Sequence, residues 1–291
     1  MRVFAVGATG VLGGALVPML VERGHRVTVL APDRLEALPP EVARVRGGLL
    51  DDHIRLEELI AGDDAVVNLA TSMPRNPAAP GAWRETSRIR GEGTSRLVTA
   101  ARAAGVRRLV QMSITMAYPD GGDTWLTEDT PLDPDPARRA VVGPVAELES
   151  TLGAVSPSEL AWTVLRGSRF AGSGTVQDTQ RELLARGEMR IPGDGGSYVS
   201  MVHVADYARA VLAALEGDAA GRVLNVSDTP VTTGEYLTEL ARRTGCPPPE
   251  HDRDAAPDLP SQRVDSGAVL RELGWRPRHG IWPPADGRDG W

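Results

Sequence analysis

The chain has 291 residues, 41% of them hydrophobic, which suits one large domain or a core domain with a smaller lobe. Its net charge of −7 argues against binding nucleic acid or anionic membranes, and no apolar run approaches the roughly 20 residues of a membrane span. The single cysteine, Cys246, excludes an internal disulfide, and no two histidines have metal-ligand spacing. We therefore expect a cytoplasmic protein without a metal, present as a monomer or homodimer.

Short apolar runs alternate along the chain with amphipathic segments such as 94–104. The predicted strands are Val3–Val6, Val27–Leu30, Val42–Val45, Ala65–Leu69, Leu109–Met112, Trp162–Leu165 and Val223–Val226. Strands that are apolar throughout and alternate with helices indicate a parallel sheet covered on both faces. The sequence therefore predicts an α/β fold.

The first predicted strand, Val3–Val6, leads into a glycine turn with the spacing Gly7-x-x-Gly10-x-x-Gly13. Apolar residues at helical spacing follow it. Glycines let the backbone approach a dinucleotide pyrophosphate, and the start of the helix offers unpaired N–H groups. The alternative is a glycine-rich turn without a ligand, but the strand–helix context favours nucleotide binding. The predicted cofactor contacts in this turn are Gly7, Thr9, Gly10, Val11, Leu12 and Gly13.

The end of the second predicted strand indicates which nicotinamide is bound. NAD enzymes usually place a carboxylate there to bind the ribose 2′-hydroxyl. Here Leu30 is followed by uncharged residues and then by Asp33 and Arg34. Arg34 favours a 2′-phosphate, although Asp33 argues for NAD and a solvated charge at a helix start is the plain alternative for Arg34. We expect NADP(H) rather than NAD(H).

Three later segments supply the remaining cofactor contacts. Leu49 follows the third strand, where the adenine ring would lie. Leu69, Ala70 and Thr71 end the fourth strand beside the cofactor. Ser113 ends the fifth strand and would carry a hydroxyl to the nicotinamide end.

These residues resemble the extended and atypical short-chain dehydrogenase/reductases, the superfamily that includes sugar-nucleotide epimerases and dehydratases. The resemblance covers nearly the whole chain. Besides the glycine motif, the matching segments are Asn68–Ala70, Leu165–Arg166, Val202–Asp206, Leu224–Val226 and Leu273–Pro277. The resemblance implies a Rossmann doubly wound parallel sheet over residues 1–165. It also implies a C-terminal substrate lobe over 166–291, with a core strand returning near 223–226.

The chain departs from that family in its proton relay. The family uses a Tyr-x-x-x-Lys pair on the helix after the fifth strand, but alignment places Val141 and Val145 at those positions. No tyrosine lies between Tyr118 and Tyr198, and all 32 basic residues are arginine. The family's asparagine is replaced by Arg90, and Gly48 stands where the family has an adenine-contacting aspartate.

The hydride half of the chemistry is therefore preserved while the proton relay is lost. One explanation is a reductase whose proton comes from Ser113, Thr115, Tyr118, a water or the substrate itself. The other is a protein that binds NADP without turnover, as a sensor. Ser113, Thr115 and Tyr118 are the candidate catalytic residues, each with a structural alternative: local backbone bonding for a hydroxyl or loop packing for the tyrosine. His203 is interpreted as structural.

The apolar residues near the predicted nicotinamide end suggest a flat, hydrophobic pocket. They are Met73, Trp83, Met116, Trp125, Phe170 and Met201. We therefore predict an NADPH-dependent ketoreductase acting on a hydrophobic, aromatic polyketide-type ketone, similar to the reductases that tailor angucyclinone antibiotics. A sugar-nucleotide epimerase or dehydratase is less favoured, because both reactions begin with oxidation by the missing pair.

Overall fold

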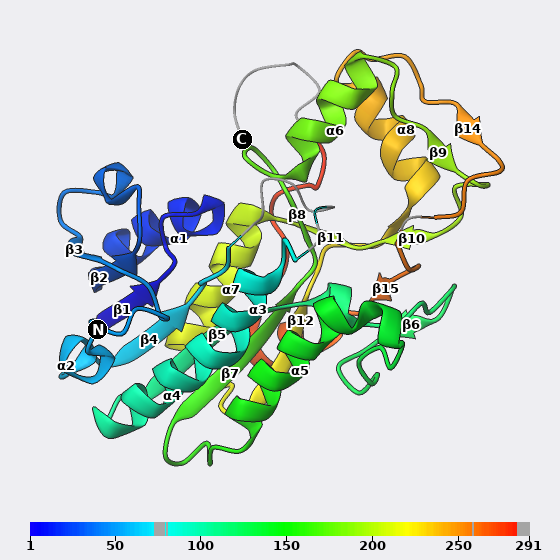
Figure 1. Ribbon diagram of the computed structural model, residues 1–291. Helices are drawn as coiled ribbons and strands as arrows, with labels where there is room; N and C mark the ends of the chain where they lie inside the picture. The colour runs from blue at the N-terminus through cyan, green and yellow to red at the C-terminus, as the bar shows by residue number, and fades with distance from the viewer. Residues whose placement is uncertain (73–78, 80, 258, 284–291) are drawn as a thin grey trace.

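A computed structural model of the protein describes residues 1–72, 79, 81–257 and 259–283. Within these residues the centre is a wholly parallel seven-stranded sheet, with the order β12-β7-β5-β4-β1-β2-β3 (Figure 1). The strands are β1 (Arg2–Val6), β2 (Arg26–Ala31), β3 (Ala43–Arg46), β4 (Ala65–Asn68), β5 (Arg108–Ile114), β7 (Ala161–Gly167) and β12 (Arg222–Val226). Each predicted strand overlaps one of these, and the predicted α/β fold with a Rossmann-type sheet is confirmed.

The strand order reverses between β1 and β4. From β1 the chain moves outward to β2 and β3, and it then returns to place β4 on the other side of β1. In doubly wound sheets, ligands bind beyond the carboxyl ends of the strands at such a reversal. The turn at Gly7 and the segment from Leu69 to Ser72 therefore lie where a ligand is expected.

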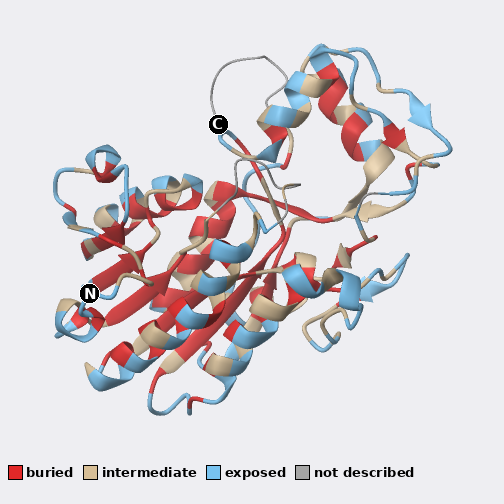
Figure 2. Cartoon of the chain, viewed as in Figure 1, coloured by how far each residue is buried: buried red, intermediate tan, exposed pale blue. Residues whose placement is uncertain are grey.

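Helices cover both faces of the sheet, so the sheet itself is buried (Figure 2). On one face lie α1 (Val11–Glu22), α7 (Val204–Glu216) and α9 (Gly267–Leu273). On the other lie α2 (Leu56–Ile60), α4 (Thr94–Ala103) and α5 (Arg139–Gly153). Coverage on both sides explains why all of β4 is buried rather than alternating between apolar and polar.

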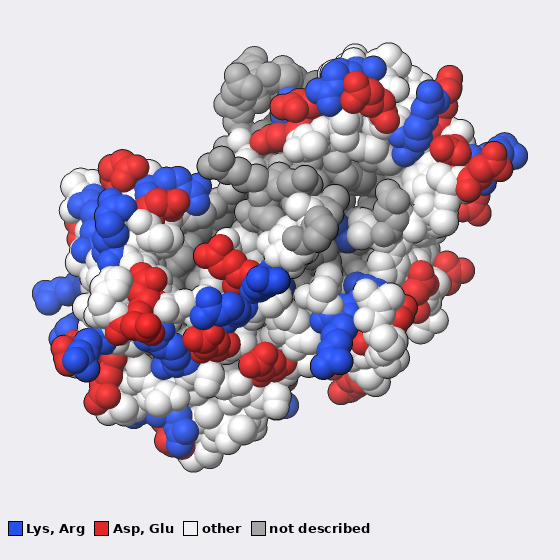
Figure 3. Space-filling model, viewed as in Figure 1, with Lys and Arg blue, Asp and Glu red and all other residues white. Residues whose placement is uncertain are grey.

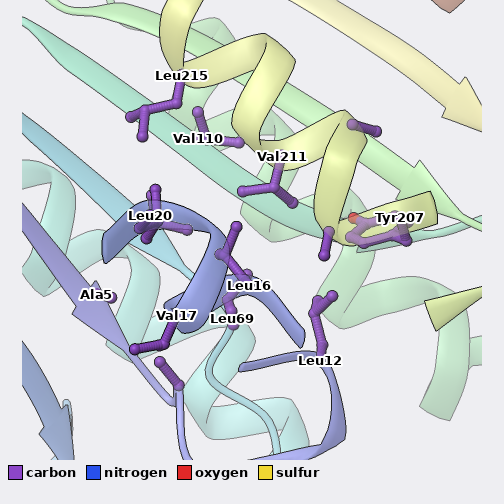
Figure 4. Packing of buried hydrophobic residues seen from close by; sticks show 14 of the residues in the cluster. Ala5, Leu12, Leu16, Val17, Leu20, Leu69, Val110, Tyr207, Val211 and Leu215 are labelled. Carbon is purple, nitrogen blue, oxygen red and sulfur yellow. The ribbon is translucent and has the colours of Figure 1, made fainter. Parts of the chain in front are cut away.

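The packing of α1 against α7 fixes the helix that follows the glycine turn (Figure 4). Leu16 and Leu20 of α1 are fully buried in one core with Val211 and Leu215 of α7. Burial of each such side chain contributes about 1.5–3 kcal/mol. The start of α1 is thereby held at the carboxyl end of β1.

The helix before β5 changes its winding part-way. It runs as α3 (Arg84–Arg88), widens into a π-helical segment η2 (Ile89–Gly93), and continues as α4. A Cβ on Gly91 would lie 2.4 Å from a carboxylate oxygen of Glu147 in α5, so any larger residue there would require the Glu147 side chain to move. Wide turns of this kind are frequent at functional sites.

A smaller lobe follows β7, apart from the return of the chain to the sheet as β12. It contains β8 (Arg169–Ala171), α6 (Val176–Ala185), β9 (Ile191–Pro192), β10 (Tyr198–Val199), β11 (Met201–His203), β13 (Val231–Thr232), α8 (Thr233–Arg243) and β14 (His251–Asp252). Its own apolar core includes Leu184, Ile191, Tyr236 and Leu240. The domain boundary near residue 165 stays a prediction.

Short elements complete the described structure. They are η1 (Leu35–Ala37), η3 (Thr115–Ala117), β6 (Trp125–Leu126), η4 (Pro136–Arg138) and β15 (Arg263–Val264). Across the described ranges, no helix combines the length and apolar character needed to cross a bilayer.

Candidate active site

The glycine turn after β1 is shaped by close backbone contacts. Gly7 has φ +73°, and a Cβ there would lie 2.6 Å from the Cα of Ala70. A Cβ on Gly13 would lie 2.1 Å from the carbonyl oxygen of Ala8. A Cβ on Gly10 would meet only the Gly7 carbonyl oxygen, at 3.8 Å. Gly7 and Gly13 are therefore required by the protein backbone, whereas Gly10 borders open space that a phosphate can enter.

The start of α1 has unpaired donors. Its N-cap residue is Gly10, no side chain caps it, and its first turn carries no acidic residue. Val11, the first helical residue, is 41% exposed. Unpaired N–H groups and the positive end of the helix dipole are favourable for an anion, so this turn fits a dinucleotide pyrophosphate.

The segment after β4 adds a second indication of a ligand. Leu69 is buried, and the backbone N–H of Ala70 donates to Asn68 Oδ1 at 3.1 Å. The Thr71 hydroxyl is buried without a hydrogen-bond partner among the described residues. Because an unpaired buried hydroxyl is costly, the Thr71 hydroxyl is a candidate for hydrogen bonding to a ligand.

Two arginines, Arg34 and Arg46, lie near the end of β2. Arg34 has φ +52°, is exposed and lies 3.4 Å from a carboxylate oxygen of Asp33. Arg46 at the end of β3 donates to the Pro32 carbonyl at 2.9 Å. The sequence reasoning missed Arg46, which the parallel pairing of β2 with β3 brings beside the end of β2. Leu49, farther along, is buried against Gly93.

The predicted relay region holds a buried network instead of a tyrosine–lysine pair. Ser113 Oγ donates to Glu149 Oε1 at 2.9 Å. Arg166 pairs with both oxygens of Glu149, at 2.9 and 2.6 Å. Arg166 also donates to the Tyr118 hydroxyl at 2.7 Å, and that hydroxyl donates to Asn225 Oδ1 at 2.9 Å. The network ties α5 to the carboxyl ends of β5, β7 and β12.

Burial sets the ionisation of this network. It raises the pKa of Tyr118, and the charge of Arg166 offsets this rise only in part. Burial by itself lowers the pKa of Arg166, but the hydrogen bond to Glu149 and the Tyr118 oxygen hold that pKa above its usual value. Tyr118 is therefore a neutral phenol at pH 7, with no exposed surface.

The structure brings Ser113 and Tyr118 into one network and leaves Thr115 outside it. The Thr115 hydroxyl lies 3.3 Å from that of Ser168. Val145, which stands at the lysine position, is fully buried in an apolar cluster with Val142. The only charged residue of strand β7, Arg166, was the sequence signal for a buried acidic partner, which is Glu149.

Three of the residues expected to line an apolar pocket have different surroundings. Met201 lies in the core of the small lobe, and Phe170 packs on Tyr207 with ring centroids 5.2 Å apart. Trp125 is 46% exposed beneath the Arg263 guanidinium. Met73 lies outside the described residues. His203 caps α7, its Nδ1 accepting from the N–H of Ala205 at 3.2 Å, in keeping with its structural interpretation.

Comparison with known proteins agrees with this geometry. Residues 3–227 match the model of the NAD dependent epimerase/dehydratase family. The chain belongs to that family. A 3-diazoavenalumate denitrifying reductase from a Streptomyces species is 38% identical, over 99% of this chain and 100% of that protein. A 2-alkyl-3-oxoalkanoate reductase from Stenotrophomonas maltophilia (strain K279a) is 29% identical, over 85% of this chain and 77% of that protein.

The family is also evident in solved structures. MoeE5 in complex with UDP-glucuronic acid and NAD is 26% identical and has a TM-score of 0.78, covering 97% of this chain and 95% of that one. The predicted membership of the extended short-chain dehydrogenase/reductases is confirmed. This member of the epimerase/dehydratase family is an NAD(P)-dependent oxidoreductase that uses a nicotinamide dinucleotide.

Proposed function

We propose that the protein is an NADPH-dependent reductase whose substrate is reduced without a proton from a Tyr–Lys pair, and that a diazo-substituted aromatic compound is the first candidate. The proposal rests on one observation in α5: Val141 and the buried Val145 occupy the positions of the family's tyrosine and lysine. The name of the 38% identical relative, which specifies a diazo substrate and denitrification, supports the same chemistry.

The electron and proton balance explains why the relay is dispensable. Reduction of a ketone adds a hydride to carbon and requires a proton for the oxygen, which a general acid normally supplies. An aryldiazonium ion that gains a hydride gives the arene and dinitrogen, and needs no proton. A site without a proton donor therefore fits the diazo substrate better than an ordinary ketone.

The residues of this chain would bind the cofactor and order the site. Gly7, Gly10 and the start of α1 hold the pyrophosphate, and Thr71 supplies a hydroxyl. The reduced nicotinamide, when bound, supplies the hydride. Thr115, whose hydroxyl lies 3.3 Å from that of Ser168, is the predicted catalytic hydroxyl outside the buried network and is assigned to the substrate. Ser113 and Tyr118 hold the strand ends through Glu149 and Arg166.

NADPH is favoured over NADH by the two guanidiniums near the end of β2. Arg34 and Arg46 lie where the adenosine ribose is expected, and arginine is suited to a phosphate. Asp33 is the opposing feature. Changing Arg34 and Arg46 together to glutamine would weaken NADPH binding by at least about tenfold and leave NADH binding unchanged. Equal losses for both cofactors would contradict the assignment.

The experiment that tests the reaction is an assay of NADPH consumption with 3-diazo-4-hydroxycinnamate, with dinitrogen followed by mass spectrometry. With deuterium at the transferable position of the nicotinamide, one deuterium should appear on the ring carbon that carried the diazo group. NADPH binding without consumption of any diazo arene would overturn the proposal.

The second candidate is a substrate-assisted ketoreductase, and the 29% identical oxoalkanoate reductase favours it. In this version an aromatic polyketide-type ketone of the angucyclinone class carries a neighbouring phenol that supplies its own proton. Turnover on a phenol-adjacent ketone that is lost on methylation of the phenol would support it.

A further inference from the structure

The loop before α6, residues 172–175, lies against the start of the cofactor helix α1. A Cβ on Gly174 would lie 3.1 Å from Cγ2 of Val11, the first residue of α1. A Cβ on Gly172 would lie 3.0 Å from Nε2 of His203, the N-cap residue of α7. The loop 172–175 therefore contacts the starts of both helices and borders the turn that fits the pyrophosphate.

One buried side chain, Gln177, holds this loop. The backbone N–H of Gly172 donates to Gln177 Oε1 at 2.9 Å, and Gln177 Nε2 donates to the carbonyl of Ile281 at 2.6 Å. Gln177 is 2% exposed, so both hydrogen bonds are shielded from water. Because one partner is a donor and the other an acceptor, only a side chain that both accepts and donates satisfies the two.

Ile281 belongs to a C-terminal strap, residues 275–283, that runs from α7 to the small lobe (Figure 1). At α7, the buried carboxylate of Asp206 accepts from the backbone N–H groups of Arg278 and His279, at 2.8 and 2.7 Å. In the lobe, Ile281 is buried in the apolar core. The strap is thus anchored in both parts of the molecule, and it gives the amide that holds the loop a fixed support.

Surface charge does not explain how the protein would retain a dinucleotide. The chain has a net charge of −7, and on the face drawn in Figure 3 basic and acidic side chains are interspersed. A dinucleotide is itself an anion, so long-range attraction is weak and retention depends on contacts near the pyrophosphate. The loop 172–175 lies where such a contact is needed.

We propose that Gln177 is a positioning residue for the cofactor: by tying the loop 172–175 to the C-terminal strap, it holds the loop against α1 and slows dissociation of the dinucleotide. The loop must move away from α1 before the pyrophosphate can leave, and both hydrogen bonds of Gln177 oppose that movement. This role requires a nicotinamide dinucleotide at the glycine turn, but it depends neither on the preference for NADPH nor on the proposed substrate.

The rate at which the dinucleotide dissociates tests this role. Bound NADPH, or NADH if the parent protein binds it more tightly, is displaced by excess oxidised cofactor, and its fluorescence is followed by stopped flow. Gln177→Met introduces a side chain of similar length that makes neither hydrogen bond. We expect dissociation about tenfold faster than in the parent, with the association rate changed by less than about twofold. A dissociation rate equal to that of the parent, whether or not the unfolding temperature falls, overturns the proposal.

Gln177→Glu provides a rescue that a change in folding alone would not produce. When protonated, the introduced carboxyl accepts from Gly172 and donates to the Ile281 carbonyl as the amide does, whereas the ionised form can only accept. Burial raises the pKa of a carboxyl, so we expect dissociation as slow as in the parent at about pH 6 and about tenfold faster at about pH 9. Fast dissociation at both pH values contradicts the proposal. Because both contacts are kept at the lower pH, this variant tests the role even if Gln177→Met does not fold.

Gln180→Glu is the matched control in the same helix. Gln180 Oε1 accepts from the Tyr236 hydroxyl at 2.8 Å, a contact that a carboxylate also makes. Its dissociation rate should equal that of the parent at both pH values. The pH dependence expected of Gln177→Glu, if it appeared in this control, would assign the effect to charge in α6 and overturn the proposal. Failure of the reductase proposal is seen separately, as absence of NADPH consumption by the parent protein.

Discussion

The cofactor turn keeps the residues typical of the family, whereas the region between β5, α5 and β7 in the same sheet does not. At the turn, Gly7 and Gly13 keep the family spacing, because close backbone contacts leave no room for a side chain. Around α5 the relay positions are apolar, and Glu149 and Arg166 form a buried ion pair instead. In the proposed reaction the protein keeps the binding of a hydride donor, while Glu149 and Arg166 support the strand ends where the family has its proton relay.

The largest expected effect is the loss of cofactor binding on substitution of Gly7→Ala. The new Cβ would clash with Ala70, and φ +73° is unfavourable for alanine, so we expect NADPH binding to be lost in a fluorescence titration. Gly14→Ala in α1 is the control, because a Cβ there meets nothing within 4 Å. It should stabilise the helix by up to about 1 kcal/mol. NADPH binding retained by the Gly7 variant would refute the cofactor assignment.

The second-largest expected effect is on stability, when the carboxylate of the buried ion pair is removed. Glu149→Gln would leave the Arg166 guanidinium buried without its carboxylate, at a cost of about 3–5 kcal/mol in the free energy of unfolding. Urea denaturation measures it. Glu147→Gln, an exposed acid on the same helix, should change stability by less than about 0.5 kcal/mol. Similar values for both variants would show that the network does not support the sheet ends.

A smaller effect is expected at Ser113. Ser113→Ala removes one hydrogen bond to Glu149, costing about 1 kcal/mol in stability. Loss of a true general acid typically lowers kcat by about 10²–10⁴-fold, and we expect a smaller loss here. A decrease of that size in kcat, without a matching loss of stability, would restore Ser113 as a direct participant.

The smallest expected effect is that of pH on kcat, which we expect to stay constant. Burial raises the pKa of Tyr118 above its ordinary value, so this phenol stays protonated through neutral and mildly alkaline pH. If no protein group donates a proton, kcat with a diazo substrate should be flat between about pH 6 and 9. A fall in kcat with an apparent pKa near neutrality would reveal a general acid and contradict the proposed reaction.

Local sequence determined the fold and the cofactor turn. Apolar runs, helical spacing and the glycines of Gly7 to Gly13 act over a few residues, so strand positions and the turn could be predicted from the sequence. The absence of the relay tyrosine and lysine was also evident directly from the sequence. The sequence could not assign the roles of Ser113 and Tyr118, because their partners Glu149, Arg166 and Asn225 are distant along the chain.

The tertiary structure alone decided which charges are satisfied. Arg166 and Arg169 are three residues apart on consecutive strands, and nothing in their local sequence separates them. Packing of α5 on the sheet gives Arg166 its carboxylate, whereas Arg169, beyond the crossing into the small lobe, is half-buried and has no ion pair with any residue in the described ranges. The energy of a charge depends on what surrounds it in three dimensions, so the ion pair of Arg166 with Glu149 became visible only in the folded chain.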